Sequence, residues 1–115
     1  LKSMTDLAES LMHTGHYGEA EKVLRETLNI QRRVLGPDHA DTAATTYALA
    51  RIAVHKGESE KAVSLLRQAL DHGLEQRIAI GIENDPDLNS LHGGPRFEAL
   101  VSDAHQRAAA AAKAK

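Results

Sequence analysis

The sequence repeats itself with a period of 42 residues. Placing residues 1–31 on residues 43–73, a shift of 42 places, brings eight pairs of identical residues into register, most of them small or apolar. The pairs are Leu7 with Leu49, Ala8 with Ala50, His13 with His55, Gly15 with Gly57, Ala20 with Ala62, Leu24 with Leu66, Arg25 with Arg67 and Leu28 with Leu70. A short repeated unit buries its apolar face only by stacking on its neighbours. The repeat therefore predicts a stack of two units, followed by a segment that does not repeat.

Each unit has the pattern of two helices joined by a tight turn. In the first unit, Met4, Leu7, Ala8 and Leu11 follow helical spacing and predict one buried stripe. Gly15 then supplies the left-handed conformation that commonly ends a helix. The inward residues expected in the second unit are Thr46, Leu49, Ala50 and Ala53 on its first helix and Ala62, Leu65, Leu66, Ala69 and Leu70 on its second.

Small residues and helix breakers mark how the units pack and where they meet. The alanines expected at helix crossings, where a methyl group permits close approach, are Ala8, Ala20, Ala50 and Ala62. The segment Gly36-Pro37-Asp38 combines a helix stop with a restart. Asp38 and Asp41 have the spacing of a capping box, so we expect Asp38 to cap the next helix.

Two turn segments carry a resemblance to a known family. Residues 15–20 (Gly-His-Tyr-Gly-Glu-Ala) and 57–62 (Gly-Glu-Ser-Glu-Lys-Ala) resemble the turn of the tetratricopeptide repeat. That repeat usually has 34 residues. The longer period, together with residues 34–39 (Val-Leu-Gly-Pro-Asp-His), resembles repeats of the kinesin-light-chain type, which are common in bacterial proteins. The resemblance implies an all-α fold of antiparallel hairpins stacked as a short right-handed solenoid.

The last third of the chain does not continue the repeat. The pattern predicts a short helix from about residue 74 to 83, a proline-containing turn at 85–88 and a longer helix from Pro95. The stripe of the longer helix is Phe97, Leu100, Val101, Ala104 and Ala108. This end resembles the C-terminal end of bacterial tetratricopeptide arrays, including those that follow serine/threonine kinase domains. Such a helix would cap the apolar end of the stack.

The expected division of the chain follows from these patterns. We assign residues 1–36 to the first hairpin, 37–73 to the second, 74–94 to the short helix with its Pro/Gly-containing turn, and 95–115 to a C-terminal capping helix. We expect its Ala/Lys tail, from residue 108 onward, to fray.

Composition excludes several functional classes. The chain has no Cys, which removes disulfides, thiolate zinc sites and a cysteine nucleophile. The net charge of −2 gives no general attraction to nucleic acid or anionic lipid. The longest apolar run is the alanine stretch at 108–112, and no segment has the pattern of a signal peptide. We therefore expect a soluble, cytoplasmic chain that binds neither nucleic acid nor membrane.

The sequence offers no convincing catalytic or metal-binding motif. A phosphate-binding loop, a His-Glu-x-x-His motif and a nucleophile elbow are all missing, so we predict a non-catalytic chain without a cofactor. Asp85, Asp87 and Asn89 have the spacing of the first three ligands of a calcium loop, but Ser90 and Arg96 occupy the Gly and Glu positions. The alternative interpretation is that Asp85 caps a helical turn that begins at Pro86.

Two histidines form the other candidate metal site. His13 and His55 occupy the same position in successive repeats, so we expect them to lie near each other. Two imidazoles could ligate a metal, but a stable site needs further ligands, and the cation Arg51 lies one turn before His55. The alternative is that both are polar residues that end a helix or contact a ligand. We predict no metal site.

The face opposite each buried stripe is where tetratricopeptide stacks usually bind, so this is the candidate site. The predicted contact residues are Asp6, Glu9, His13, Tyr47, Arg51 and His55. We expect Met12 and Tyr47 to offer apolar contact and Arg51 to anchor an acidic group. The carboxylate clamp of co-chaperone repeats is missing, because Thr5, Glu9 and Tyr47 stand at its positions. The alternative is a solvated face without a ligand.

Three hypotheses for function follow. The first is a protein-interaction scaffold that binds a peptide or a partner domain on its concave face. The second is a C-terminal regulatory appendage of a larger bacterial enzyme, such as a serine/threonine kinase. The third is self-association through the N-terminal face of the stack, which is left uncovered because the chain starts at Leu1 within a helical pattern.

Overall fold

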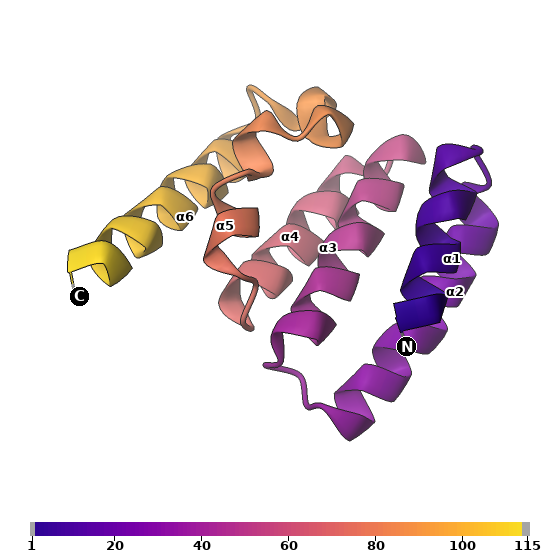
Figure 1. The fold of residues 1–115 in the computed structure, drawn as a ribbon. Coiled ribbons are helices and arrows are strands. Elements are labelled where there is room, and N and C mark those ends of the chain that lie inside the picture. The colour runs from indigo at the N-terminus through magenta and orange to yellow at the C-terminus, as the bar shows by residue number, and fades with distance from the viewer. Residues whose placement is uncertain (1, 114–115) are drawn as a thin grey trace.

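The computed structural model describes residues 2–113, and all the regular structure in this range is helical. Helices α1 (Lys2–His13) and α2 (Tyr17–Val34) form the first antiparallel hairpin, and α3 (Ala40–His55) and α4 (Ser59–Asp71) form the second. In Figure 1 the two hairpins lie side by side, with α1 and α3 toward the viewer and α2 and α4 behind them. The stack of two helical hairpins is the predicted architecture.

The non-repeating part of the chain completes the stack at its C-terminal end. It contains α5 (Gln76–Ala79), two 3-10 helices, η1 (Ile82–Asn84) and η2 (Pro86–Leu91), and the long helix α6 (Pro95–Lys113). In Figure 1 this part lies on the far side of the second hairpin from α1 and α2. Helix α6 begins at Pro95 as predicted, and it continues through the alanine run to Lys113.

The hairpin turns are closed by glycines with positive φ, as the sequence predicts. Gly15 and Gly57 have φ values of 82° and 79°. In each turn the next residue returns its backbone N–H to the preceding helix, His16 to Leu11 O and Glu58 to Ala53 O. These bonds satisfy carbonyl groups that a helix C-terminus otherwise leaves unpaired.

The core consists of two apolar clusters that share α3. One joins α1 and α2 to α3 through Ala8, Met12, Ala20, Leu24, Leu28, Ala48, Leu49 and Ile52. The other joins α3 and α4 to the C-terminal segment, with Phe97, Leu88, Ile82 and Leu100 at most 1% exposed. The four alanines predicted at helix crossings are also at most 1% exposed: Ala8, Ala20, Ala50 and Ala62. The stripe of α6 is buried as predicted through Ala104, and Ala108 is half-buried.

Helix α3 is buried on most of its circumference because it has neighbours on several sides. It packs between α2 and α4, and η2 covers part of its remaining face. Three of its threonines are buried, and their hydroxyl groups donate to backbone carbonyls: Thr42 to Gly36 O, Thr45 to Asp41 O and Thr46 to Thr42 O. These bonds allow hydroxyl groups to be buried without losing a hydrogen bond.

The buried stripe of α1 differs from the prediction. Leu7 is 52% exposed, whereas Met12, which we expected to face the groove, is 7% exposed and belongs to the core. The repeat explains the exposure of Leu7. Its equivalent, Leu49, packs against the preceding hairpin, and among the described residues no element precedes α1.

Two further local predictions were wrong. The helix predicted from residue 74 to 83 is interrupted: α5 ends at Ala79, and Gly81 separates it from η1. Glycine disfavours a helix interior by about 1 kcal/mol, and the extended backbone of Asp85 before Pro86 prevents a longer helix. The N-cap of α3 is His39, whose side chain accepts the N–H of Asp41, and not Asp38. Asp38 bonds instead to His72 Nδ1 at 2.7 Å.

None of the helices in the described part of the chain is both long enough and apolar enough to cross a membrane.

Candidate partner-binding site

A groove lies between the first helices of the two hairpins. It has a volume of about 620 Å³. Four of the six predicted contact residues line it, Asp6 and Glu9 from α1 and Tyr47 and Arg51 from α3. The remaining lining residues are Thr5, Gln31, Asp41, Ala44, Thr45, Ala48 and Ile78. The repeat explains the juxtaposition, because equivalent faces of α1 and α3 are adjacent in the stack.

Arg51 is the centre of the charge network at one end of this groove. Its Nη2 and Nε donate to Asp87 Oδ2 at 2.9 and 3.1 Å, and its Nη1 donates to Glu9 Oε1 at 3.4 Å. Burial alone would lower the pKa of Arg51, but the hydrogen bond to Asp87 and the charges of Glu9, Asp87 and Asp85 raise it. Arg51 is therefore a permanent cation that joins α1, α3 and η2.

Tyr47 is tied to the same C-terminal segment. Its hydroxyl donates to Asp85 Oδ2, and its ring is buried. Burial raises the pKa of Tyr47, and the carboxylate of Asp85 raises it further, so the phenol stays a neutral donor. Asp85 Oδ1 also accepts the N–H of Asp87 at 2.9 Å, which makes Asp85 the N-cap of η2. The helix-capping interpretation of Asp85 is confirmed.

His55 and His13 have different surroundings. The ring of His55 stacks on Tyr17, with centroids 4.5 Å apart and planes 11° from parallel, and its Nε2 lies 2.9 Å from Asp87 Oδ1. His13 is exposed at the end of α1. Thus the partners of His55 are Tyr17 and Asp87, and neither histidine lines the groove. Within the described residues, no group of three or more His, Cys, Asp or Glu side chains is arranged to hold a metal ion.

The segment Asp85-Pro86-Asp87 therefore lies against the inner face of α3 and holds three predicted contact residues. Burial would raise the pKa of Asp87, but the hydrogen bonds from His55 and Arg51 outweigh this effect and lower it. The acidic group that we expected Arg51 to anchor is supplied by the chain itself. Sequence reasoning identified the cap at Asp85 but missed this docking. The only signal was an acidic pair that flanks Pro86 in a chain whose α3 bears Arg51 and His55.

Sequence reasoning also missed the floor of the groove. Gln31, on the second helix of the first hairpin, is only 4% exposed and lines the groove. Its Oε1 is buried, and no donor in the described part of the chain reaches it. A buried carbonyl oxygen without a donor costs about 1–3 kcal/mol. Gln31 therefore lines the groove and has an acceptor that no described donor uses.

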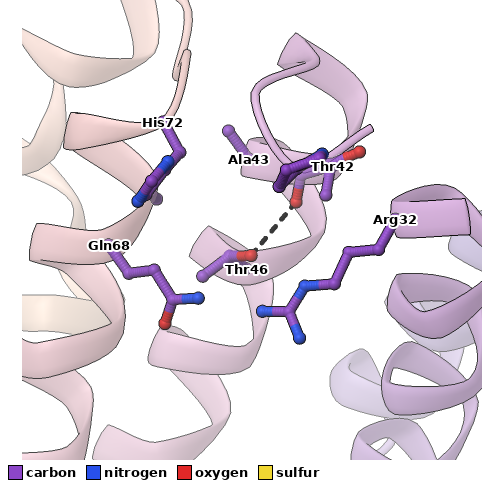
Figure 2. Close-up of a pocket in the computed structure, with 8 residues that line it drawn as sticks. Arg32, Thr42, Ala43, Thr46, Gln68 and His72 are labelled. Carbon is purple, nitrogen blue, oxygen red and sulfur yellow. Dashed lines mark hydrogen bonds between the residues drawn. The ribbon is translucent and has the colours of Figure 1, made fainter. Parts of the chain in front are cut away.

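A smaller cavity of about 230 Å³ lies beside α3 on the side of α2 and α4 (Figure 2). Figure 2 shows the side chains of Arg32, Gln68 and His72 around it, with Thr46 donating to the carbonyl of Thr42. Its described lining contains no carboxylate. Since none of the predicted contact residues lines this cavity, the groove between α1 and α3 is the better candidate site.

The fold and groove define an α-helical hairpin-repeat protein. The sequence profile of the tetratricopeptide repeat matches residues 1–73, which span α1 to α4. The chain therefore belongs to the tetratricopeptide repeat family. Comparisons with curated proteins and with solved structures found no match. The finer resemblance to light-chain-type and bacterial repeats stays a prediction.

Proposed function

We propose that this chain is a non-catalytic interaction module that binds an extended segment of a partner protein in the groove between α1 and α3. Tetratricopeptide repeats generally mediate protein–protein interactions. The observation that carries the proposal is the groove itself, with a volume of about 620 Å³ and walls from two successive repeats. A surface built by repetition suits an extended ligand, because equivalent side chains recur along it.

The titratable side chains at the groove support a binding role over a catalytic one. Tyr47 has a raised pKa because it is buried against Asp85, and Arg51 has a raised pKa because carboxylates surround it. Neither group exchanges a proton near neutral pH, which a general acid or base must do. The hypothesis of a regulatory appendage concerns sequence outside these 115 residues and stays a prediction.

A selection experiment tests the proposed function. A randomised peptide library is selected on the immobilised 115-residue chain, and enriched peptides are measured by fluorescence anisotropy. Ala44→Trp fills the groove and should abolish binding, whereas Ala99→Trp on the exposed side of α6 should not. Circular dichroism melting confirms that both variants fold. Equal affinity of the two variants would place the binding site outside the groove.

A second candidate function is self-association through the first hairpin. Leu7 is 52% exposed although its repeat equivalent Leu49 is 6% exposed, and Val34 of the same hairpin is 70% exposed. An exposed apolar face at the end of a repeat stack favours pairing. Light scattering should detect a dimer in the wild type that Leu7→Glu disrupts and Ile80→Glu, at an exposed site on the C-terminal segment, does not. A monomeric wild type at high concentration would exclude this function.

A further inference from the structure

The open part of the groove carries unbalanced negative charge. Its described lining contains three carboxylates, Asp6, Glu9 and Asp41, and one basic residue, Arg51. Arg51 is already surrounded, because Asp87 lies at 2.9 Å, Glu9 at 3.4 Å and Asp85 at 3.9 Å from its guanidinium nitrogens. A new acidic ligand would have to displace Asp87 from Arg51. The charge available to a ligand is therefore negative.

Two of these carboxylates have no balancing cation among the side chains that the structure describes. No basic side chain that the structure describes pairs with Asp6, which lies exposed on α1. The nearest basic group to Asp41 is His39, with Nδ1 at 4.0 Å from Asp41 Oδ2. That nitrogen accepts the backbone N–H of Asp41 at 3.0 Å, so it has no proton to share with the carboxylate. Asp6 and Asp41 therefore place uncompensated charge on the two opposite walls of the groove.

The floor of the groove adds a second, independent feature. Gln31 lies there, 4% exposed, and its Oε1 has no donor from the described residues. An ammonium or guanidinium group has several donors and no acceptor, so it satisfies both an orphan carbonyl and nearby carboxylates. The alkyl stem of such a side chain packs on apolar surface, which Ala44 and Ile78 provide along the same groove.

We propose that this groove binds a basic peptide segment, and that one lysine or arginine side chain enters between Asp6 and Asp41 and donates to Gln31. This inference rests on the proposed function and names the chemistry of the partner. A ligand held only by attraction to the carboxylates would make no hydrogen bond to Gln31. A neutral amide ligand would leave Asp6 and Asp41 uncompensated. Only a long cationic side chain uses the walls, the stem surface and the floor together.

The experiment uses the peptides selected from the randomised library on the 115-residue chain. The proposal expects these peptides to share one Lys or Arg, whose replacement by Gln weakens binding. The double variant Asp6→Asn/Asp41→Asn should bind the peptide roughly tenfold more weakly. Glu19→Gln/Glu26→Gln is the matched control, because it changes the net charge equally at exposed positions on α2. This control should bind like the wild type.

A third variant tests the floor without confusing binding with folding. Gln31→Met has nearly the same shape and removes the unpaired carbonyl, so it should fold at least as stably as the wild type. The proposal expects it to bind the selected peptide several-fold more weakly. Unchanged affinity in Gln31→Met, or in Asp6→Asn/Asp41→Asn, would overturn the proposal.

The possible failures can be told apart. Acidic or neutral peptides that lose binding in Ala44→Trp would overturn the basic partner and leave the groove as a binding site. Peptides that bind Ala44→Trp normally would overturn the proposed function as well, and so would a selection that enriches no peptide.

Discussion

Arg51 of α3 and Asp87 of η2 are joined by two hydrogen bonds, from Nη2 at 2.9 Å and from Nε at 3.1 Å to the same carboxylate oxygen. The other oxygen of Asp87 lies 2.9 Å from His55 Nε2. One carboxylate of the non-repeating segment thus contacts both the guanidinium of Arg51 and the imidazole of His55 in the second hairpin. The C-terminal segment caps the end of the stack with apolar residues and also docks on the inner face of α3 with charged ones.

Replacing Asp87 with Asn should destabilise the fold because it leaves the partly buried Arg51 without its main anion. The side chains of Arg51 and Asp87 are 20% and 30% exposed, so water weakens the interaction only in part. We expect a loss of about 1–2 kcal/mol in unfolding free energy by urea denaturation. Glu75→Gln is the control, because its partner Arg77 is 82% exposed, and it should change little. Equal stability of both variants would show that the pairing of Arg51 with Asp87 adds little to the docking of η2.

The same carboxylate predicts a dependence of stability on pH. Burial opposes ionisation of Asp87, but the hydrogen bonds from His55 and Arg51 outweigh this effect, so the pKa of Asp87 in the folded protein is lowered. A carboxyl group whose pKa is lowered by folding stabilises the folded protein at any pH above its pKa in the unfolded chain, which is about 4. This stabilisation is lost as the pH falls through its pKa in the folded protein.

Urea denaturation of the wild type and Asp87→Asn between pH 7 and pH 2.5 measures this effect. The difference in unfolding free energy should stay constant from about pH 7 to pH 5 and shrink below about pH 4. In Arg51→Gln, where both hydrogen bonds from the guanidinium to Asp87 are removed, the loss in acid should be smaller. A difference that stays the same down to pH 2.5 would contradict the assignment.

The repeat made most of the fold predictable, because it specifies local structure and packing together. Ala8 and Ala50 share one repeat position and Ala20 and Ala62 another, and the close helix crossings explain why alanine recurs at both. Leu7 was predicted incorrectly for a related reason. Repetition indicates which residues face a neighbouring hairpin, but no described hairpin lies before α1 to bury Leu7.

The candidate site was less predictable, because its partners come from a part of the chain without a repeat. Periodicity placed Tyr47 and Arg51 on the inner face, and both line the groove or its end. It carried no information about η2, so the docking of Asp85 and Asp87 on these residues could not be derived. Gln31 was missed because it belongs to α2, an outer helix of its hairpin. Its long side chain nevertheless lines the groove between the two inner helices.

The hydrogen bond from Tyr47 to Asp85 predicts that the two tyrosines respond differently to removal of the hydroxyl group. Tyr47→Phe removes the donor to Asp85 while keeping the buried ring, and should cost about 1–2 kcal/mol. Tyr17→Phe keeps the ring that stacks on His55 and should change stability by less than about 0.5 kcal/mol. Thermal or urea denaturation of both variants measures the difference. Unchanged stability of Tyr47→Phe would mean that the hydrogen bond from Tyr47 does not help to hold Asp85 in place.

Gly73, at the end of α4, should tolerate a methyl group less well than the turn glycine Gly57. Both have positive φ, 106° and 79°, so alanine at either position adopts a backbone conformation that costs about 1–2 kcal/mol. At Gly57 the added Cβ meets open space, but at Gly73 it would lie 2.4 Å from the backbone oxygen of Asp38. The end of α4 therefore lies close against the connection between the hairpins, and the backbone must shift to admit alanine at position 73.

We therefore expect Gly73→Ala to lower the unfolding free energy by more than Gly57→Ala, by about 1 kcal/mol or more. Urea denaturation of the two variants under the same conditions measures this difference, and an unchanged m-value shows that the unfolded states are comparable. Similar losses in both variants would show that the connection at Asp38 moves freely. In that case the close approach of Gly73 would add nothing to the stability of the stack.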